Sequence, residues 1–166
     1  KEIKTARLKN PASIILKLNS LSDEMLIDKL YEAAKSGVEI KLIIRGIFCM
    51  LTEHKKFKIP VQAISIVDEY LEHSRIMIFH NGGKERTFIS SADWMVRNID
   101  HRVEVACPIF EKNIQQEIKD IIQIQLKDNI KARILDNDLG NQYVNPRNTK
   151  KIRSQVETYN YLYRKG

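Results

Sequence analysis

The sequence predicts an α/β fold in which a mixed β-sheet is flanked by helices, with further helices at the C-terminal end. Two observations carry this prediction: β-rich runs alternate with segments of helical apolar spacing, and helical spacing returns near the end of the chain. A length of 166 residues suffices for one ordinary domain with a sizeable core. We therefore expect residues 1–166 to form a single domain. The chain begins with Lys1 rather than methionine, so we expect it to be a piece of a longer chain.

The first unit of the predicted fold is a strand, a helix and a second strand. Residues 13–18 are rich in β-branched and apolar side chains, and Ser22 is placed to cap a helix after them. An apolar stripe predicts that helix, and Gly37 marks its end. The stripe consists of Leu26, Leu30, Ala33 and Ala34. Residues 38–44 return as a strand, which a crossover would make parallel to the first.

The later elements are shorter and follow an irregular loop at residues 48–60. The predicted strands are residues 61–67, 75–79, 86–90 and 102–109. The sequence Asn81-Gly82-Gly83 is typical of a tight hairpin turn between the second and third of these. Isoleucines at helical spacing from Ile114 predict a helix that ends near Lys127, and a final helix is predicted from Thr149 to Tyr163.

Charge and cysteine content narrow the partners and the compartment. The formal net charge is +7, and the excess lies in residues 1–9 and 141–166, which carry +3 and +5. Two basic ends favour a polyanionic partner, but charge alone does not choose between nucleic acid, anionic lipid and polyphosphate. Cys49 and Cys107 are too few for a disulfide framework, so we expect buried thiols in a reducing compartment. No apolar run could span a bilayer and no signal peptide is visible, so the cytoplasm is the expected location.

Side chains suited to phosphate chemistry gather between residues 73 and 93. His73 and Arg75 are two residues apart, so an extended chain points both to one face. An imidazole can attack phosphorus or carry a proton, and a guanidinium neutralises phosphate oxygens. Ser90 and Ser91 can donate hydrogen bonds to such oxygens, and Asp93 can orient an imidazole or bind a metal-associated water.

A second polar group follows, and a third lies earlier in the chain. Arg97 precedes Arg102 and Glu104, whose spacing leaves open both a buried Arg–Glu pair and direct contact with a ligand. Arg45 precedes Gly46 at the end of a predicted strand, where a guanidinium fork and a close backbone approach suit a phosphate. His54, His80 and His101 have no metal-ligand spacing, and the sequence predicts no metal ligands.

The phosphate-handling residues resemble a modified phospholipase D half-site. That family has His-x-Lys followed by a turn of small residues that ends in Asn. Here Arg75 stands in place of the Lys and Asp93 in place of the Asn. Both departures speak against a lipase or nuclease activity.

A closer resemblance covers residues 13–163: the chain is similar to the last domain of bacterial polyphosphate kinase. The motifs that carry it occur in order along the chain. They are Asn19-Ser20-Leu21, Ile44-Arg45-Gly46, residues 64–67, residues 70–75, His80-Asn81-Gly82-Gly83, residues 89–98 and residues 102–105. The resemblance implies a phospholipase-D-like domain, and an enzyme that reversibly transfers the terminal phosphate of ATP to inorganic polyphosphate with Mg²⁺.

The resemblance also implies roles and partners. The histidine that becomes phosphorylated lies in the preceding domain, outside this chain. Arg45 matches a contact to nucleotide phosphates, and His73 matches the second histidine of the active site. The implied partners are ATP or ADP, polyphosphate rather than nucleic acid, the preceding domains, and further copies of the full-length protein. The implied location is the cytoplasm, including peripheral attachment to the inner face of the membrane.

Two other classes of function stay open. One is a phospholipase-D-like phosphodiesterase or nuclease, which would cleave a diester without ATP. The other is a non-catalytic module that binds polyanions. Residues 1–166 alone are expected to be inactive, because half of the active site would be absent.

Overall fold

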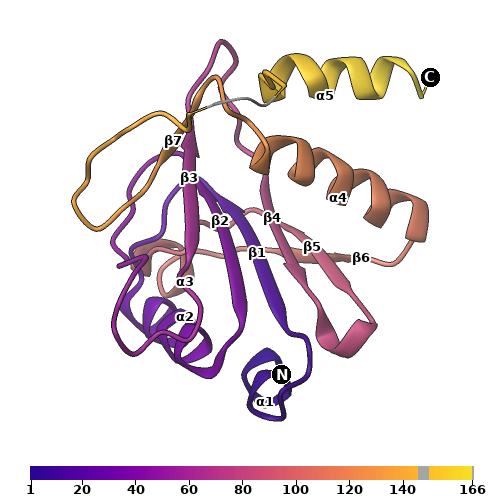
Figure 1. The fold of residues 1–166 in the computed structure, drawn as a ribbon. Coiled ribbons are helices and arrows are strands. Elements are labelled where there is room, and N and C mark those ends of the chain that lie inside the picture. The colour runs from indigo at the N-terminus through magenta and orange to yellow at the C-terminus, as the bar shows by residue number, and fades with distance from the viewer. Residues whose placement is uncertain (146–149, 166) are drawn as a thin grey trace.

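A mixed β-sheet organises the molecule (Figure 1). The structure, a computed structural model, describes residues 1–145 and 150–165. Within that part of the chain seven strands form one sheet in the order β6-β5-β4-β1-β2-β3-β7. Their bounds are β1 Ser13–Leu18, β2 Glu39–Ile44, β3 Gln62–Ile66, β4 Arg75–Phe79, β5 Arg86–Ser90, β6 Ala106–Ile109 and β7 Ala132–Ile134. The predicted α/β class with a mixed sheet is confirmed.

The centre of the sheet is the predicted strand-helix-strand unit. β1 pairs in parallel with β2, and β2 pairs in parallel with β3. Helix α2, Glu24–Ser36, connects β1 to β2 and ends at Gly37, whose φ of 95° is the left-handed conformation that glycine adopts without strain. Because parallel strands with covered faces bury side chains on both sides, this unit is the most apolar part of the chain.

The two faces of the sheet carry separate cores. Leu16, Leu42 and Ile44 face α2 and are fully buried. Ile15 and Ile43 point to the opposite face because side chains alternate along a strand, and they pack there against Ile122 of helix α4, Lys112–Leu126. Figure 1 shows α2 and α4 covering different parts of the sheet.

The other strands are antiparallel to their neighbours. β4 lies beside β1 and forms the predicted hairpin with β5, while β6 pairs with β5 and β7 pairs with β3. The hairpin turn is a short 3₁₀ segment, η1, Asn81–Gly83. Three further helices complete the described chain: α1 Glu2–Arg7, α3 Val96–Ile99 and α5 Ser154–Tyr163. α1, α3 and β7 were not predicted, because each is too short to show a period.

Several boundaries differ from prediction for local reasons. The cap of α2 is Asp23 rather than Ser22: its carboxylate accepts from the N–H of Leu26 at 2.9 Å. Ser22 is held outside the helix because its N–H donates to the carbonyl of Trp94. The final helix begins at Ser154, and the predicted start at Thr149 lies outside the described residues.

The prediction for residues 102–109 was wrong over its first half. Only Ala106–Ile109 form a strand, and Val103 is 99% exposed. Its valines alternate with charged residues as in a half-buried strand, but the segment precedes the edge strand β6, and Val103 and Val105 remain exposed. Cys49 and Cys107 are also exposed, which corrects the expectation of buried thiols.

Candidate active site

The predicted phosphate-handling residues converge on one edge of the sheet. Arg45 follows the end of β2, and Asn19 follows the end of the parallel neighbour β1. β4 is antiparallel to β1, so its first residue, Arg75, reaches the same edge, as does Ser90, which pairs with Arg75 at the end of β5. The ends of these four strands therefore bring Asn19, Arg45, Arg75 and Ser90 together at this edge.

Asp93 is the centre of the polar contacts at this edge. It is 6% exposed and receives the Arg75 guanidinium in a two-bond fork, Nε to Oδ1 at 3.1 Å and Nη2 to Oδ2 at 3.0 Å. Oδ1 also accepts from the N–H groups of Asn19 and Ser20, at 2.8 and 3.2 Å. Burial alone would raise the pKa of Asp93, but the Arg75 guanidinium and these N–H groups hold it below its ordinary value. Asp93 is therefore ionised at neutral pH.

Asn19 extends this network to Arg45. Its side-chain oxygen accepts from Nε and Nη2 of Arg45, at 3.3 and 3.1 Å. Gly46 lies against the Asn19 carbonyl, where a Cβ atom would come within 3.0 Å of the oxygen. The predicted close approach at Gly46 therefore occurs within the fold, and it fixes the strand end that carries Arg45.

His73 lies in the loop before β4 with its side chain exposed. Its carbonyl accepts from Nη1 of Arg75 at 3.1 Å, so Arg75 joins Asp93 to the histidine's backbone. The preceding residue, Glu72, is ion-paired with Lys17 of β1. Glu72 and Lys17 line a small cavity together with Asn19 and Arg45, which places the histidine loop next to the Arg45 network.

The Lys17–Glu72 pair is a largely buried ion pair of this edge. Lys17 is 7% exposed, and burial lowers its pKa, with Arg45 acting in the same direction against the contact with Glu72. For Glu72, burial acts to raise the pKa, but Lys17 and two glutamine side chains hold it below its ordinary value. A buried pair of this kind constrains position because removing one partner leaves the other without compensation.

The second predicted group forms a separate cluster. Glu104 accepts from the Ser91 hydroxyl and from Nδ2 of Asn98, the latter at 2.6 Å. The Ser91 hydroxyl also accepts from the N–H of Val105 at 3.0 Å. The hydrogen bonds of Glu104 thus come from Ser91 and Asn98, and together with the nearby positive charge of Arg102 they hold the pKa of Glu104 below its ordinary value.

The remaining candidates have simpler surroundings. The Ser90 hydroxyl accepts from the N–H of Ala92 at 3.1 Å, as is typical of a strand-end turn. Arg97 and Arg102 are exposed, and neither side chain makes a hydrogen bond within the described residues. Both guanidinium groups are therefore free to meet a ligand.

The side chains at this edge do not offer a magnesium site. Both oxygens of Asp93 and both of Glu104 are taken by N–H or O–H donors. Within residues 1–145 and 150–165 no three His, Cys, Asp or Glu side chains come together to hold a metal ion. The Mg²⁺ that the resemblance implies therefore does not fit the described residues at this edge.

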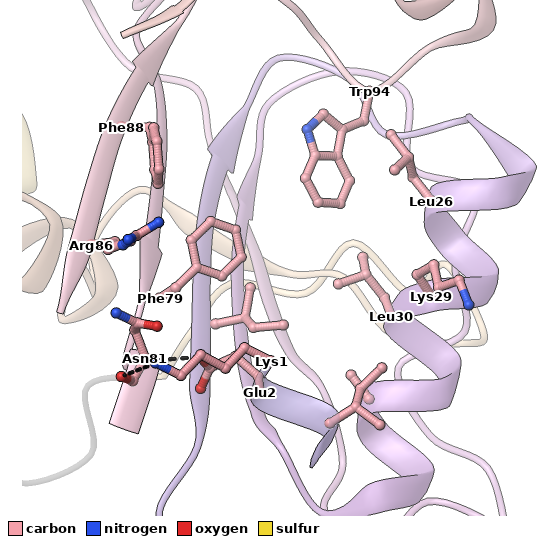
Figure 2. Close-up of a pocket in the computed structure, with 13 residues that line it drawn as sticks. Lys1, Glu2, Leu26, Lys29, Leu30, Phe79, Asn81, Arg86, Phe88 and Trp94 are labelled. Carbon is pink, nitrogen blue, oxygen red and sulfur yellow. Dashed lines mark hydrogen bonds between the residues drawn. The ribbon is translucent and has the colours of Figure 1, made fainter. Parts of the chain in front are cut away.

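The mostly apolar hollow beside Trp94 is a different feature. A cavity of about 420 Å³ lies between α1, α2 and the β4–β5 hairpin (Figure 2). Leu26, Leu30, Phe79 and Trp94 line it, and Arg45 and His73 do not. Trp94 packs against the core on the α2 face.

Sequence reasoning missed three residues that support the edge: Asn19, Lys17 and Glu72. Asn19 directly follows a strand, which was the one available signal. Lys17 lies within β1, where a polar residue between two apolar ones is typical of any half-exposed strand. Glu72 meets it across 55 residues of sequence, a distance that no local pattern encodes.

Comparison with solved structures defines the class of this protein. Nuc, a phospholipase D family member from Salmonella typhimurium, superposes with a TM-score of 0.57 at 14% identity, covering 81% of this chain and 89% of Nuc. At that identity the likeness shows the fold alone. The chain therefore has a phospholipase-D-like fold.

The sequence then places the chain in a family. The profile of the polyphosphate kinase C-terminal domain 2 matches residues 1–155, and the chain belongs to this family. It is 45% identical over 162 residues to the polyphosphate kinase of Escherichia coli, covering 98% of this chain and 24% of that protein. The crystal structure of polyphosphate kinase from Porphyromonas gingivalis superposes with a TM-score of 0.95 at 46% identity, covering 99% of this chain and 25% of that chain. The chain spans about a quarter of the length of the relatives it matches.

Among the described helices, none is both long and apolar enough to cross a bilayer.

Proposed function

We propose that residues 1–166 form the last domain of a multidomain polyphosphate kinase and supply part of its active site. The complete enzyme would transfer the terminal phosphate of ATP to inorganic polyphosphate, reversibly. The observation that carries this proposal is the chain of contacts from Arg45 through Asn19 and Asp93 to Arg75, beside His73. Membership in the polyphosphate kinase family supports it.

In this proposal Arg45 binds the phosphates of ATP. Asn19 accepts through a single oxygen from Nε and Nη2, which leaves the other edge of the guanidinium to a phosphate. An arginine oriented before the ligand arrives loses less conformational freedom on binding. Phosphoryl transfer depends mainly on positioning and charge stabilisation, so an oriented arginine is a suitable device.

His73 would contact the transferring phosphoryl group. The bond from the β–γ bridging oxygen to the γ-phosphorus breaks, ADP leaves, and the phosphoryl group joins a histidine nitrogen of the preceding domain. It then passes to the terminal oxygen of polyphosphate, which lengthens by one unit. His73 would stabilise the transferring oxygens or move a proton, because its exposed imidazole has no competing partner in the described chain.

Arg75 and Asp93 would act as positioning residues. The Arg75 fork is bound to Asp93, so it offers little to a phosphodiester, and this disfavours a phospholipase-D-type cleavage. Ser90 and Ser91 are engaged in turns, and Glu104 holds one of them. Arg97 and Arg102 would meet polyphosphate oxygens directly.

The basic C-terminal segment would guide polyphosphate toward the site. Lys150 and Lys151 are exposed, and the dense charge of polyphosphate predicts a strongly salt-dependent interaction. Unchanged polyphosphate affinity and salt slope in the Lys150→Glu, Lys151→Glu double variant of the complete enzyme would refute this part. Assembly with further copies and a cytoplasmic location belong to the same proposal.

The test uses the complete enzyme, its His73→Ala and Arg45→Lys variants, and residues 1–166 alone, each incubated with ATP and Mg²⁺. Phosphoprotein and polyphosphate are measured. We expect His73→Ala to abolish polyphosphate synthesis, and Arg45→Lys to raise KM for ATP about tenfold, because a lysine cannot reproduce the fork. Arg133→Lys is the matched control: this half-buried arginine of β7 contacts Asn141 and Tyr143 rather than Asn19, so the variant should leave KM unchanged.

The outcomes separate the open classes. Normal synthesis by His73→Ala refutes the site. Cleavage of a phosphodiester without ATP would instead favour the phosphodiesterase. Polyphosphate binding without turnover by the complete enzyme would favour the non-catalytic module.

A further inference from the structure

The loop that carries His73 has no regular structure of its own. Residues 67–74 connect β3 to β4, and Val67, Tyr70 and Leu71 are each more than 60% exposed. A loop with so little burial must be held by specific contacts if the histidine is to have a defined position. These contacts come from the far end of the sequence.

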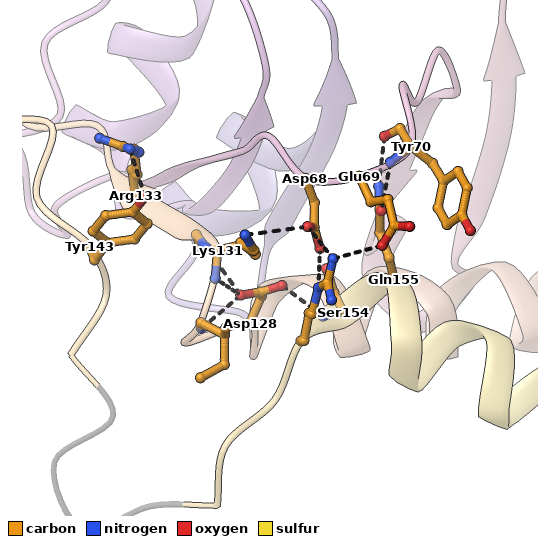
Figure 3. A network of polar contacts seen from close by, with 12 residues as sticks. Asp68, Glu69, Tyr70, Asp128, Lys131, Arg133, Tyr143, Ser154 and Gln155 are labelled. Atoms are coloured by element: carbon orange, nitrogen blue, oxygen red, sulfur yellow. Dashed lines mark hydrogen bonds and ion pairs between the residues drawn. The ribbon is translucent and has the colours of Figure 1, made fainter.

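Arg153 binds the first part of the loop. Its Nε and Nη2 donate to the two oxygens of Asp68, each at 2.8 Å, and Nη2 also donates to Glu69 at 3.0 Å. The Asp68 side chain is 1% exposed, and the Arg153 guanidinium holds its pKa below the ordinary value. Figure 3 shows Asp68 and Glu69 facing the start of α5.

Gln155 binds the second part. Its Oε1 accepts from the N–H of Tyr70 at 3.0 Å, and its Nε2 donates to the Tyr70 carbonyl at 2.7 Å. The same Nε2 donates to Oε1 of Glu72 at 3.0 Å (Figure 3 shows Gln155 against Tyr70). One side chain thereby satisfies both backbone groups of Tyr70 and reaches the residue next to His73.

Glu72 receives support from two further elements. Lys17 reaches it from β1, and Nε2 of Gln125, on α4, donates to it at 2.9 Å. The carboxylate is thus enclosed by donors from a strand and two helices, and its orientation depends on α5 through Gln155.

The start of α5 is itself fixed. Asp128 is 1% exposed, and its Oδ2 accepts from the N–H of Ser154 at 2.7 Å. Its Oδ1 accepts from three consecutive N–H groups, those of Ile130, Lys131 and Ala132, at 2.7–3.0 Å. Arg153 and Gln155 flank Ser154, so the residues that hold the loop project from an anchored point.

We propose that Arg153 and Gln155 are positioning residues for His73, acting through the backbone of residues 68–72. This inference rests on the proposed function, because it takes His73 as the group to be positioned. If these contacts served only to attach α5 to the rest of the domain, the loss of any other contact that attaches α5 would lower kcat equally. Tyr161 provides that comparison: its hydroxyl donates to Asp120 of α4 at 2.7 Å and touches no residue of the loop.

The test compares Gln155→Leu, Gln155→Glu and Tyr161→Phe in the complete enzyme. Leucine keeps the side-chain volume and removes every hydrogen bond, while glutamate keeps the acceptor for Tyr70 and loses the donor. Thermal midpoint, kcat, KM for ATP and hydrogen exchange of residues 67–74 are measured. We expect Gln155→Leu to lower kcat at least about tenfold with KM for ATP within about twofold, since Arg45 is untouched.

Further expected results are specific to the loop. Exchange of residues 67–74 should accelerate in Gln155→Leu, and at least as much in Gln155→Glu, whose carboxylate would face the Tyr70 carbonyl and the Glu72 carboxylate. Tyr161→Phe should leave kcat unchanged. An unaltered kcat in Gln155→Leu overturns the inference, as does an equal loss in Tyr161→Phe. The proposed function fails separately, when His73→Ala keeps the normal rate. The inference fails when His73→Ala is slow and Gln155→Leu is not.

Discussion

Arg45 and His73 stand at the same edge of the sheet but are held by different parts of the chain. Arg45 leaves the end of a buried strand, and its partner Asn19 follows the neighbouring strand. His73 lies in an exposed loop that is contacted by Lys17 of β1 and by side chains of α4 and α5. The difference is that Arg45 is oriented by residues of neighbouring strands, whereas the loop that carries His73 also contacts helices that follow in the sequence.

The contacts that hold Arg45 and those that hold the His73 loop are organised in the same way. Each centres on a buried aspartate that collects N–H donors: Asp93 beside Arg45, and Asp128 at the start of α5. Asp93 has a guanidinium as partner, whereas Asp128 is bonded by backbone N–H groups. Replacing each aspartate therefore tests the two sets of contacts separately.

The largest effect is expected for Asp93→Ala. The substitution leaves the Arg75 guanidinium without its ion-pair partner and removes the acceptor for the N–H groups of Asn19 and Ser20. We expect the free energy of unfolding to fall by about 3–5 kcal/mol, as for other broken buried pairs. Urea denaturation measures this free energy. A smaller loss in Asp93→Ala than in Asp128→Asn would contradict the prediction.

Asp128→Asn should have the next largest effect. Asparagine keeps one acceptor oxygen for four N–H groups, so we expect a loss of about 2 kcal/mol. Burial alone would raise the pKa of Asp128, but Ser154 and the backbone N–H groups hold it below its ordinary value.

Asp128→Asn should also change how the stability of the domain depends on pH. A carboxyl whose folded pKa is lowered contributes stability above its unfolded pKa, about 3.9 for aspartate, and this is lost as pH falls through the lower folded value. The parent chain should therefore lose stability below about pH 4 more steeply than Asp128→Asn. Urea titrations from pH 6 downward measure the two slopes, and parallel slopes would contradict the assignment.

The smallest effect is expected for Arg153→Lys. Lysine keeps the charge but cannot form the two-bond fork with Asp68, and the pair is partly exposed. We expect amide exchange in residues 68–72 to accelerate about threefold, while the end of β2 beside Arg45 keeps its protection. Faster exchange both in residues 68–72 and at the end of β2 would show that the contacts of the His73 loop and those of Arg45 are not independent.

The sheet centre was predictable because its signals are local. β1, α2 and β2 follow from apolar runs, one spacing pattern and one glycine. Arg45 was singled out for its place at a strand end and Arg75 for its spacing from His73, and the topology brings both to one edge of the sheet. The strand at residues 102–109 was half wrong because alternation at Val103 and Val105 does not reveal whether anything covers it.

What the sequence by itself determined is the α/β class, the order of the main elements, the family, and the residue types suited to phosphate. What only the tertiary structure decided is which side chains hold the site. Gln155 meets Tyr70 across 85 residues, and Asp93 meets Asn19 across 74. Periodicity and capping act within a few turns of one element, whereas these partners are chosen by the packing of separate elements, which no local pattern records.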